Sequence, residues 1–333
     1  MKTKNKFLIL LFISVLSSCS EKKTIKPIKN QLTAINPLTY TGVVYAGLKD
    51  SAFVSTYSGR IALRINGLSN EILITEVNDE IYDLVYFKNR KEIIAATKNK
   101  GVLVINSTTG KTINNLKFTS KLWALNLFFS DDKKELYAFD MKGINYIWDV
   151  NNEYKIKQLP DNFPDNYLRA TKKDILFFSG KNNTISLWSK EKNKIIKERK
   201  LKGNIIDIDN KHNILLIDDN KFIKYSFKND SILYSKTHPS YIRILKRGDT
   251  IKDTYMKLKL TAGRFINNKI LTAGVDRSIR IWDSKSGTLL NDLIGHSASI
   301  TAIDISSNIK QFVSVDAKGG IKFWSLNNIN NNQ

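Results

Sequence analysis

The chain has 333 residues, 42% of them hydrophobic and 25% charged, and its formal net charge is +22. This is the composition of an ordinary globular protein, and the length allows a large core. The chain has a single cysteine, Cys19, which excludes an internal disulfide and any metal site built from cysteines.

The first 18 residues have the pattern of an export signal. Residues 1–6 carry three lysines, and residues 7–16 form an apolar stretch of ten that contains one serine, Ser14. A membrane-spanning helix needs about 20 such residues, so the stretch fits the apolar region of a signal peptide. The residues that follow, Leu16-Ser17-Ser18-Cys19, resemble a bacterial lipobox. The resemblance implies cleavage before Cys19 and attachment of lipid to its sulfur. The alternative is an ordinary cleaved signal peptide followed by an incidental cysteine.

The expected location follows from this N-terminal pattern. Residues 19–29 are a lipidated linker between the membrane and the fold. Ser20 stands where some bacteria use an aspartate to retain lipoproteins at the inner membrane. We therefore expect a protein of the cell envelope, in the periplasm or on the cell surface, anchored at the outer rather than the inner membrane.

The rest of the chain is built from repeated strand patterns. In "SIRIWD", residues 278–283, apolar and polar residues alternate, as in a half-buried strand that ends in a Trp-Asp pair. Seven stretches align on this pair, at Ile65, Ile105, Trp148, Trp188, Tyr225, Trp282 and Trp324. Successive positions lie 37–43 residues apart, except for one step of 57. No segment has a convincing helical period, so the chain is predicted to be all-β.

A period of about 40–45 residues that ends in Trp-Asp resembles the WD-repeat β-propeller family. The resemblance covers residues 30–327 and implies seven blades, each a four-stranded antiparallel sheet. It also implies that an N-terminal strand, here residues 30–36, completes the last blade and closes the ring. Residues 328–333 are expected to be a disordered tail.

The same resemblance implies buried networks of His, Ser or Thr, Asp and Trp inside the blades. The members available here are His296, Ser314 and Trp324 in the last unit, and Thr272, Asp276 and Trp282 in the unit before it. In the last unit Lys318 stands where the acid is expected. The unit before it has no Gly-His in the matching place.

The long step between Tyr225 and Trp282 implies about 15 extra residues, which we place at 238–256 as a protruding hairpin. Its basic residues Arg243, Lys246 and Arg247 form either a contact surface for a partner or a solvated loop.

No catalytic pattern stands out. His212 lies in a turn, the three histidines fall in different units, and Trp123 is expected in the core. We expect no metal, no cofactor and no nucleic-acid partner, and the positive charge is either functional or a matter of composition. The resemblance implies a monomeric, non-catalytic scaffold that binds an envelope protein. The alternatives are an accessory propeller of a respiratory system such as nitrate reductase, and an enzyme or ligand-binding protein that uses the central channel.

Overall fold

The computed structural model describes residues 39–47, 50–120, 123–180, 182–239, 241–247 and 250–326, and of 241–247 and 250–256 it describes the backbone. The expected signal peptide, Cys19, the closing strand at 30–36 and the tail at 328–333 lie outside these residues. Within the described ranges, no helix is both long and apolar enough to cross a membrane.

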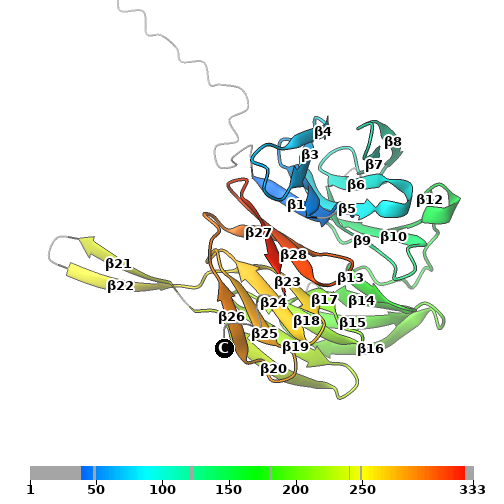
Figure 1. Cartoon of the computed structure of the whole chain (residues 1–333). Coiled ribbons are helices and arrows are strands. Elements are labelled where there is room, and N and C mark those ends of the chain that lie inside the picture. Colours follow the sequence, from blue (N-terminus) through cyan, green and yellow to red (C-terminus); the bar gives the residue numbers. More distant parts are fainter. Residues whose placement is uncertain are drawn as a thin grey trace, which may run out of the picture. The chain divides into compact units, whose positions relative to one another are not determined.

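Seven antiparallel sheets follow one another along the chain, and each forms one blade of a β-propeller (Figure 1). Blades 1 to 3 consist of β1 (Tyr40–Tyr45), β2 (Ser51–Thr56), β3 (Arg60–Ile65) and β4 (Ile72–Glu76); β5 (Ile81–Phe87), β6 (Glu92–Thr97), β7 (Val102–Asn106) and β8 (Thr112–Leu116); and β9 (Ala124–Phe129), β10 (Glu135–Asp140), β11 (Asn145–Asp149) and β12 (Lys155–Ile156).

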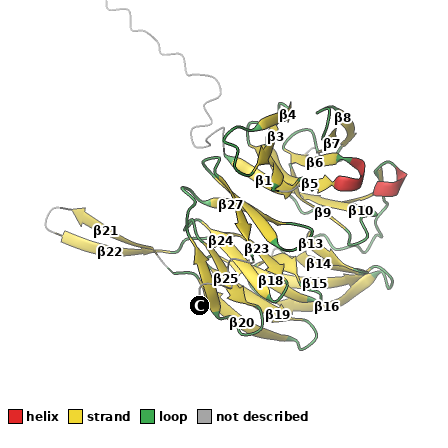
Figure 2. Cartoon of the chain, viewed as in Figure 1, coloured by secondary structure: helices red, strands yellow, loops and turns green. Residues whose placement is uncertain are grey.

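Blades 4 to 7 consist of β13 (Tyr167–Lys172), β14 (Ile175–Ser179), β15 (Thr184–Ser189) and β16 (Lys194–Lys200); β17 (Asn204–Ile208), β18 (Asn213–Asp218), β19 (Lys221–Ser226) and β20 (Ser231–Thr237); β23 (Leu260–Ile266), β24 (Lys269–Gly274), β25 (Ile279–Asp283) and β26 (Leu289–Leu293); and β27 (Ile300–Ile305), β28 (Gln311–Asp316) and β29 (Ile321–Ser325). The helices of the described chain are two 3-10 turns, η1 (Lys88–Arg90) and η2 (Val150–Asn152), shown red in Figure 2. The prediction of a seven-bladed, all-β propeller is confirmed.

The first strand of each blade is the innermost, and these strands succeed one another around a ring. β1 contacts β5, β5 contacts β9, and the series continues through β13, β17, β23 and β27 back to β1. Blade 7 has three strands among the described residues. The hydroxyl of Thr39, just before β1, donates to the carbonyl of Ala317 in blade 7 at 2.7 Å, which joins the two ends of the ring.

The core lies between blades, so its strands are buried according to their distance from the channel. Middle strands such as β2 and β6 are buried at every residue, because both of their faces pack against neighbouring blades. In one such cluster, Ile94 and Val104 of blade 2 pack with Leu136 and Trp148 of blade 3. The outermost strands are mostly exposed, β16 at nearly every position. The sequence alternation therefore marks the outer strands less clearly than the inner ones.

The third strands of blades 2 to 7 contain the positions aligned in the sequence, but blade 1 requires a correction. The backbone N–H of Asn66 donates to the carbonyl of Asp50, just before β2. In blade 2 the N–H of Ser107 donates in the same way to the carbonyl of Lys91, just before β6, and both distances are 2.8 Å. Since Ser107 lies two residues after Ile105, the equivalent position in blade 1 is Arg64, and the alignment on Ile65 is wrong by one residue. The third strand of blade 1 has no aromatic residue to fix the register.

Between blades 5 and 6 the chain forms a separate two-stranded sheet of β21 (Tyr241–Arg247) and β22 (Thr250–Met256) (Figure 1). The two strands pair antiparallel along their full length, from Tyr241 opposite Met256 to Arg247 opposite Thr250. This hairpin interrupts the connection from the outermost strand of blade 5 to the innermost strand of blade 6. Its ends are therefore rooted on the ring face at which the innermost strands begin.

Candidate functional site

A buried polar network in blade 7 contains the residues that the sequence suggested, together with an acid that it missed. Nε2 of His296 lies 2.6 Å from the Ser314 hydroxyl, which also accepts the indole N–H of Trp324 at 2.8 Å. Nδ1 of His296 lies 2.9 Å from Oδ2 of Asp316. The network therefore has its acid, although Lys318 occupies the expected position. Asp316 ends β28, two residues before Lys318, and reaches the same imidazole.

Blade 6 has an equivalent network with a histidine that the sequence analysis placed in the insertion. Nε2 of His238 lies 2.7 Å from the Thr272 hydroxyl, which accepts the indole N–H of Trp282 at 2.8 Å. Nδ1 of His238 lies 3.2 Å from Asp276, and the guanidinium of Arg280 bonds to both His238 and Asp276. The expectation that this unit lacks its histidine is wrong.

The hairpin explains why His238 was missed. In blade 7 the histidine precedes the serine, Ser314, by 18 residues, whereas in blade 6 His238 precedes Thr272 by 34. The difference equals the length of the insertion from Tyr241 to Met256. The extra residues therefore begin after His238, and the insertion is shorter at its N-terminal end than the predicted 238–256.

Burial controls the charge of both networks. It lowers the pKa of His238 and of His296, because a buried imidazolium has lost its water. Burial alone would raise the pKa of Asp276, but hydrogen bonds from His238 and Arg280 lower it to about 2. Both networks thus pair a neutral imidazole with an ionised carboxylate inside a blade, and their polar atoms bond to one another rather than facing a cavity.

Blades 3 and 4 surround the equivalent tryptophans with aromatic rings. Trp148 stacks with Tyr146 and Phe118, each at a centroid distance of 6.0 Å. Trp188 packs against Phe163 at 5.4 Å. The tryptophan at this position of the repeat is thus hydrogen-bonded to a polar network in blades 6 and 7 and packed among aromatic rings in blades 3 and 4.

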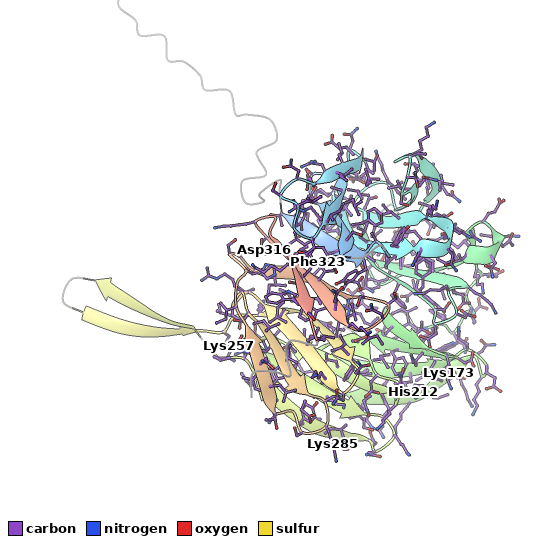
Figure 3. All side chains as sticks on the ribbon, in the orientation of Figure 1. Lys173, His212, Lys257, Lys285, Asp316 and Phe323 are labelled. Carbon is purple, nitrogen blue, oxygen red and sulfur yellow. The ribbon has the colours of Figure 1, made fainter. Side chains whose placement is uncertain are left out.

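The two other residues singled out in the sequence lie away from these networks. His212 has a left-handed backbone (φ 60°) in the turn before β18, and its ring stacks over Phe177 at 6.4 Å. Figure 3 places His212 and Asp316 in different blades. Trp123 is half-buried and its ring stacks on Tyr82 at a centroid distance of 5.2 Å. The prediction that Trp123 lies in the core is therefore wrong. Trp123 precedes β9, near the ring face on which the hairpin is rooted.

The central channel contains two adjoining cavities of about 460 and 310 Å³. Their walls come from the innermost strands, and several residues line both cavities, so the two are continuous. The shared polar residues are Asp83, Asn126, Arg169 and Arg264. The larger cavity reaches the strand starts Thr41, Asn204 and Thr261, so it opens on the face where the hairpin is rooted.

Three aspartates in the channel link neighbouring blades through hydrogen bonds. Each carboxylate accepts the backbone N–H of a residue on the innermost strand of the next blade. The pairs are Asp83 with Leu127 at 2.7 Å, Asp207 with Phe265 at 2.6 Å and Asp304 with Tyr45 at 2.8 Å. Burial deep in the channel raises the pKa of all three carboxyls.

Two arginines share the channel, and their guanidiniums form no ion pair with any described carboxylate within 4.0 Å. Arg169 makes one long hydrogen bond, 3.4 Å to the side-chain oxygen of Asn204, and its buried Nε has no partner. Its guanidinium lies over the rings of Phe139 and Tyr167, at 4.9 and 5.2 Å. Burial lowers its pKa to about 10.

The second channel arginine, Arg264, bonds only to backbone carbonyls among the described groups. Its Nη1 donates to Gly263 at 2.9 Å and, at 3.4 Å, to Ile206 of β17. Sequence analysis gave no role to the three aspartates or the two arginines of the channel. The signal available was a lone Asp inside three otherwise apolar strands, in "IYDLVYF", "NIIDI" and "ITAIDI".

The proposed basic contact residues lie on β21. In the register of the hairpin, Arg243 is opposite Thr254, and Lys246 is opposite Ile251. Arg247 pairs with Thr250 next to the tip. In the part of the chain that the structure describes, no group of three or more His, Cys, Asp or Glu side chains could hold a metal ion.

Comparison with known families agrees with the geometry of blade 7. Residues 287–325 match the model of the WD domain, G-beta repeat. This stretch is similar to a WD repeat. It contains the network of His296, Ser314 and Trp324, and it belongs to a seven-bladed propeller in which blade 6 has an equivalent network and blades 3 and 4 pack the tryptophan among aromatic rings.

Curated relatives match the chain over short stretches. One is the ribosome biogenesis protein YTM1 of Chaetomium globosum, 34% identical over 20% of this chain and 15% of the relative. Another is transcription initiation factor TFIID subunit 5 of Caenorhabditis elegans, 41% identical over 18% of this chain and 9% of the relative. The chain thus matches a small part of the length of these relatives.

Solved structures match the chain along most of its length, at low identity. U3-55K superposes with a TM-score of 0.68 at 15% identity, over 84% of this chain and 89% of that one. The computationally designed Ika8 protein superposes with a TM-score of 0.61 at 18% identity, over 88% and 98%. At these identities the likeness establishes the fold alone.

Proposed function

We propose that the chain is a non-catalytic scaffold, anchored by lipid in the bacterial cell envelope, that binds a protein partner through the ring face on which the β21–β22 hairpin is rooted. The observation that carries the proposal is the hairpin itself. It interrupts a blade connection that otherwise only links neighbouring sheets, and it forms a sheet of its own.

A two-stranded sheet is marginally stable in water by itself. Among the described strands, β21 and β22 pair only with each other, so each has an outer edge with backbone donors and acceptors available to another strand. A partner that adds an extended segment to such an edge gains main-chain hydrogen bonds. The insertion carries Arg243, Lys246, Arg247 and Lys252 against Asp249 and Asp253, so an acidic segment suits it best.

The ring supplies a rigid base for that contact. His238, three residues before β21, is held in the buried network of blade 6. The backbone N–H of Leu260, four residues after β22, bonds to the carbonyl of Asp219 in blade 5 at 2.8 Å. Both ends of the insertion are therefore fixed to neighbouring blades. One of the relatives is a subunit of a transcription initiation factor, which supports a role in assemblies.

The lipid anchor rests on the sequence at Leu16-Ser17-Ser18-Cys19. A linker of about ten residues spans at most roughly 35 Å when extended, so the propeller would stay close to the membrane surface.

The test is quantitative crosslinking in native membranes, with partners identified by mass spectrometry. Three variants are compared with the natural chain: Cys19→Ala, replacement of residues 241–256 by a short Gly-Ser turn, and a control in which the exposed Lys194 and Lys200 of β16 become serine. We expect one dominant envelope partner that is lost with the hairpin, reduced by Cys19→Ala and retained in the control. Equal capture with and without the hairpin would contradict the proposed contact, and capture unaffected by Cys19→Ala would contradict the anchor.

A further inference from the structure

We propose that the central channel binds a small molecule through an anionic oxygen group, a carboxylate or a phosphate, held between Arg169 and Arg264. The inference is independent of the protein partner proposed above. It begins from an imbalance in the channel, where the acidic groups have partners within the protein and the basic groups have few.

The three channel aspartates are satisfied by the fold. Asp83, Asp207 and Asp304 each accept a backbone N–H from the next blade at 2.6–2.8 Å. Asp83 also accepts the N–H of Leu84 at 2.8 Å. Carboxylates bound in this way have a structural role, and none lies within ion-pair distance of a channel arginine.

The two arginines are not satisfied to the same degree. Arg169 has a buried Nε without a partner and one hydrogen bond near the limit of length. Arg264 bonds to two carbonyls, one of them at 3.4 Å. Both arginines are half-buried, and the charge of Arg264 acts on the three channel aspartates, although none is within ion-pair distance. A guanidinium offers five donors in a planar fork that matches an oxyanion, and few of the donors of Arg169 and Arg264 are used within the protein.

The two guanidiniums are placed to act on one ligand. Arg169 reaches β17 at Asn204, and Arg264 reaches it at Ile206. The Cα atoms of residues two apart in a strand lie about 7 Å from each other. The two arginines therefore bond to neighbouring positions of the same strand. An oxyanion between them could bond to both and would relieve their mutual repulsion.

The cavity has the size and access for a small ligand. The larger void, about 460 Å³, lies within the usual range for small-molecule sites, roughly 300–1,000 Å³. Arg169, Arg264 and Asn204 all line it. Asn126 also contributes to the wall, from a left-handed backbone (φ 51°) in β9. Left-handed backbone outside glycine is uncommon and often marks functional sites.

The experiment uses the full chain in detergent, with inorganic phosphate and succinate as probes and sodium chloride of equal ionic strength as the reference. Thermal unfolding and titration calorimetry are measured for the natural chain, Arg169→Met and Arg264→Met. The matched control is Arg199→Met. Arg199 lies on the outer strand of blade 4, and its exposed guanidinium pairs with Asp230.

We expect a saturable rise of the unfolding midpoint with phosphate, succinate or both, and the stronger probe identifies the ligand group. Affinity should fall at least about tenfold in each channel variant and stay unchanged in the control, since each variant removes a charge-assisted contact. Without a probe, Arg169→Met should unfold at the same temperature as the natural chain or higher, because it removes a half-buried cation that has no ion-pair partner and a buried Nε without a hydrogen bond. A purely structural arginine would instead give a lower midpoint.

Two results would overturn the inference. One is the absence of any effect of phosphate and succinate beyond that of chloride on the natural chain. The other is undiminished binding in both Arg169→Met and Arg264→Met. Calorimetry on the natural chain decides the question even if a variant fails to fold.

Discussion

Blades 6 and 7 differ from blades 3 and 4 in how they hold the tryptophan of the third strand. In blades 6 and 7 the indole N–H of Trp282 or Trp324 enters a hydrogen-bonded network with a histidine and an acid. In blades 3 and 4 Trp148 and Trp188 pack among aromatic rings. The blade topology thus tolerates either chemistry, and the family match covers the network of blade 7 but not the equivalent network of blade 6.

The largest effect should come from the aromatic blades. Trp148→Ala removes a ring that is 2% exposed and packs against blade 2. Loss of a buried aromatic side chain typically lowers the free energy of unfolding by about 3–5 kcal/mol. Denaturant unfolding of Trp148→Ala is compared with Trp123→Ala, which removes a half-buried ring and should cost clearly less. Equal losses would mean that the interface between blades 2 and 3 does not depend on Trp148.

The next effect concerns the polar blades. His238→Ala removes the buried imidazole that Thr272, Asp276 and Arg280 share and leaves a cavity in the blade, which should cost about 2–3 kcal/mol of unfolding free energy. The control is His212→Asn, which keeps a residue tolerant of the left-handed turn and should change stability by less than about 0.5 kcal/mol. A negligible loss in His238→Ala would show that the blade 6 network does not hold the blade.

A matched pair of aspartates sharpens the comparison. Asp316 and Asp140 occupy the same turn in blades 7 and 3, and Oδ1 of each accepts two backbone N–H groups. Oδ2 of Asp316 bonds to His296, whereas Oδ2 of Asp140 is buried without a partner. Asp316→Ala should therefore destabilise the protein by about 1 kcal/mol more than Asp140→Ala in denaturant unfolding. The reverse order would contradict the assignment of Asp316 to the network.

The smallest effect is a dependence on pH. The pKa of His238 and His296 is lowered by burial, so the unfolded chain takes up protons near pH 6.5 before the folded chain does. Stability is therefore complete above about pH 6.5 and falls as the pH drops toward 5, by at most about 1.4 kcal/mol per pH unit for each histidine. Unfolding free energies of His238→Gln and His296→Gln, measured from pH 7 to 5, should show a flatter profile. A profile as steep as that of the natural chain would rule out these histidines as its source.

The sequence was sufficient for the architecture because four of the third strands carry a tryptophan near their end, and the repeat spacing is regular apart from one step. Trp148, Trp188, Trp282 and Trp324 lie in equivalent strands. The alignment was wrong by one residue in blade 1, where Arg64 occupies the position of the tryptophan and no aromatic residue marks it. His238 was missed because the hairpin separates it in sequence from the rest of its blade. The pairing of β21 with β22 shows which residues are inserted and so brings His238 into line with His296.

The channel was beyond sequence reasoning for a different reason. Asp83, Arg169 and Arg264 lie in the innermost strands of three different blades. Only closure of the ring brings them to one wall, so no local spacing announces them. Asp316 was missed because a carboxylate at a strand end reaches the same imidazole as one placed two residues further into the turn.

The proposed contact through the hairpin is tested most directly by site-specific photo-crosslinking. A photoreactive amino acid is placed at Leu245 in β21 or, for comparison, at Ile113, which is 55% exposed on the outer strand β8. Both lipidated chains are irradiated in their native membranes. We predict one discrete protein adduct from position 245 and none of that size from position 113. The same adducts from both positions, or none from position 245, would contradict a scaffold that binds its partner through the hairpin.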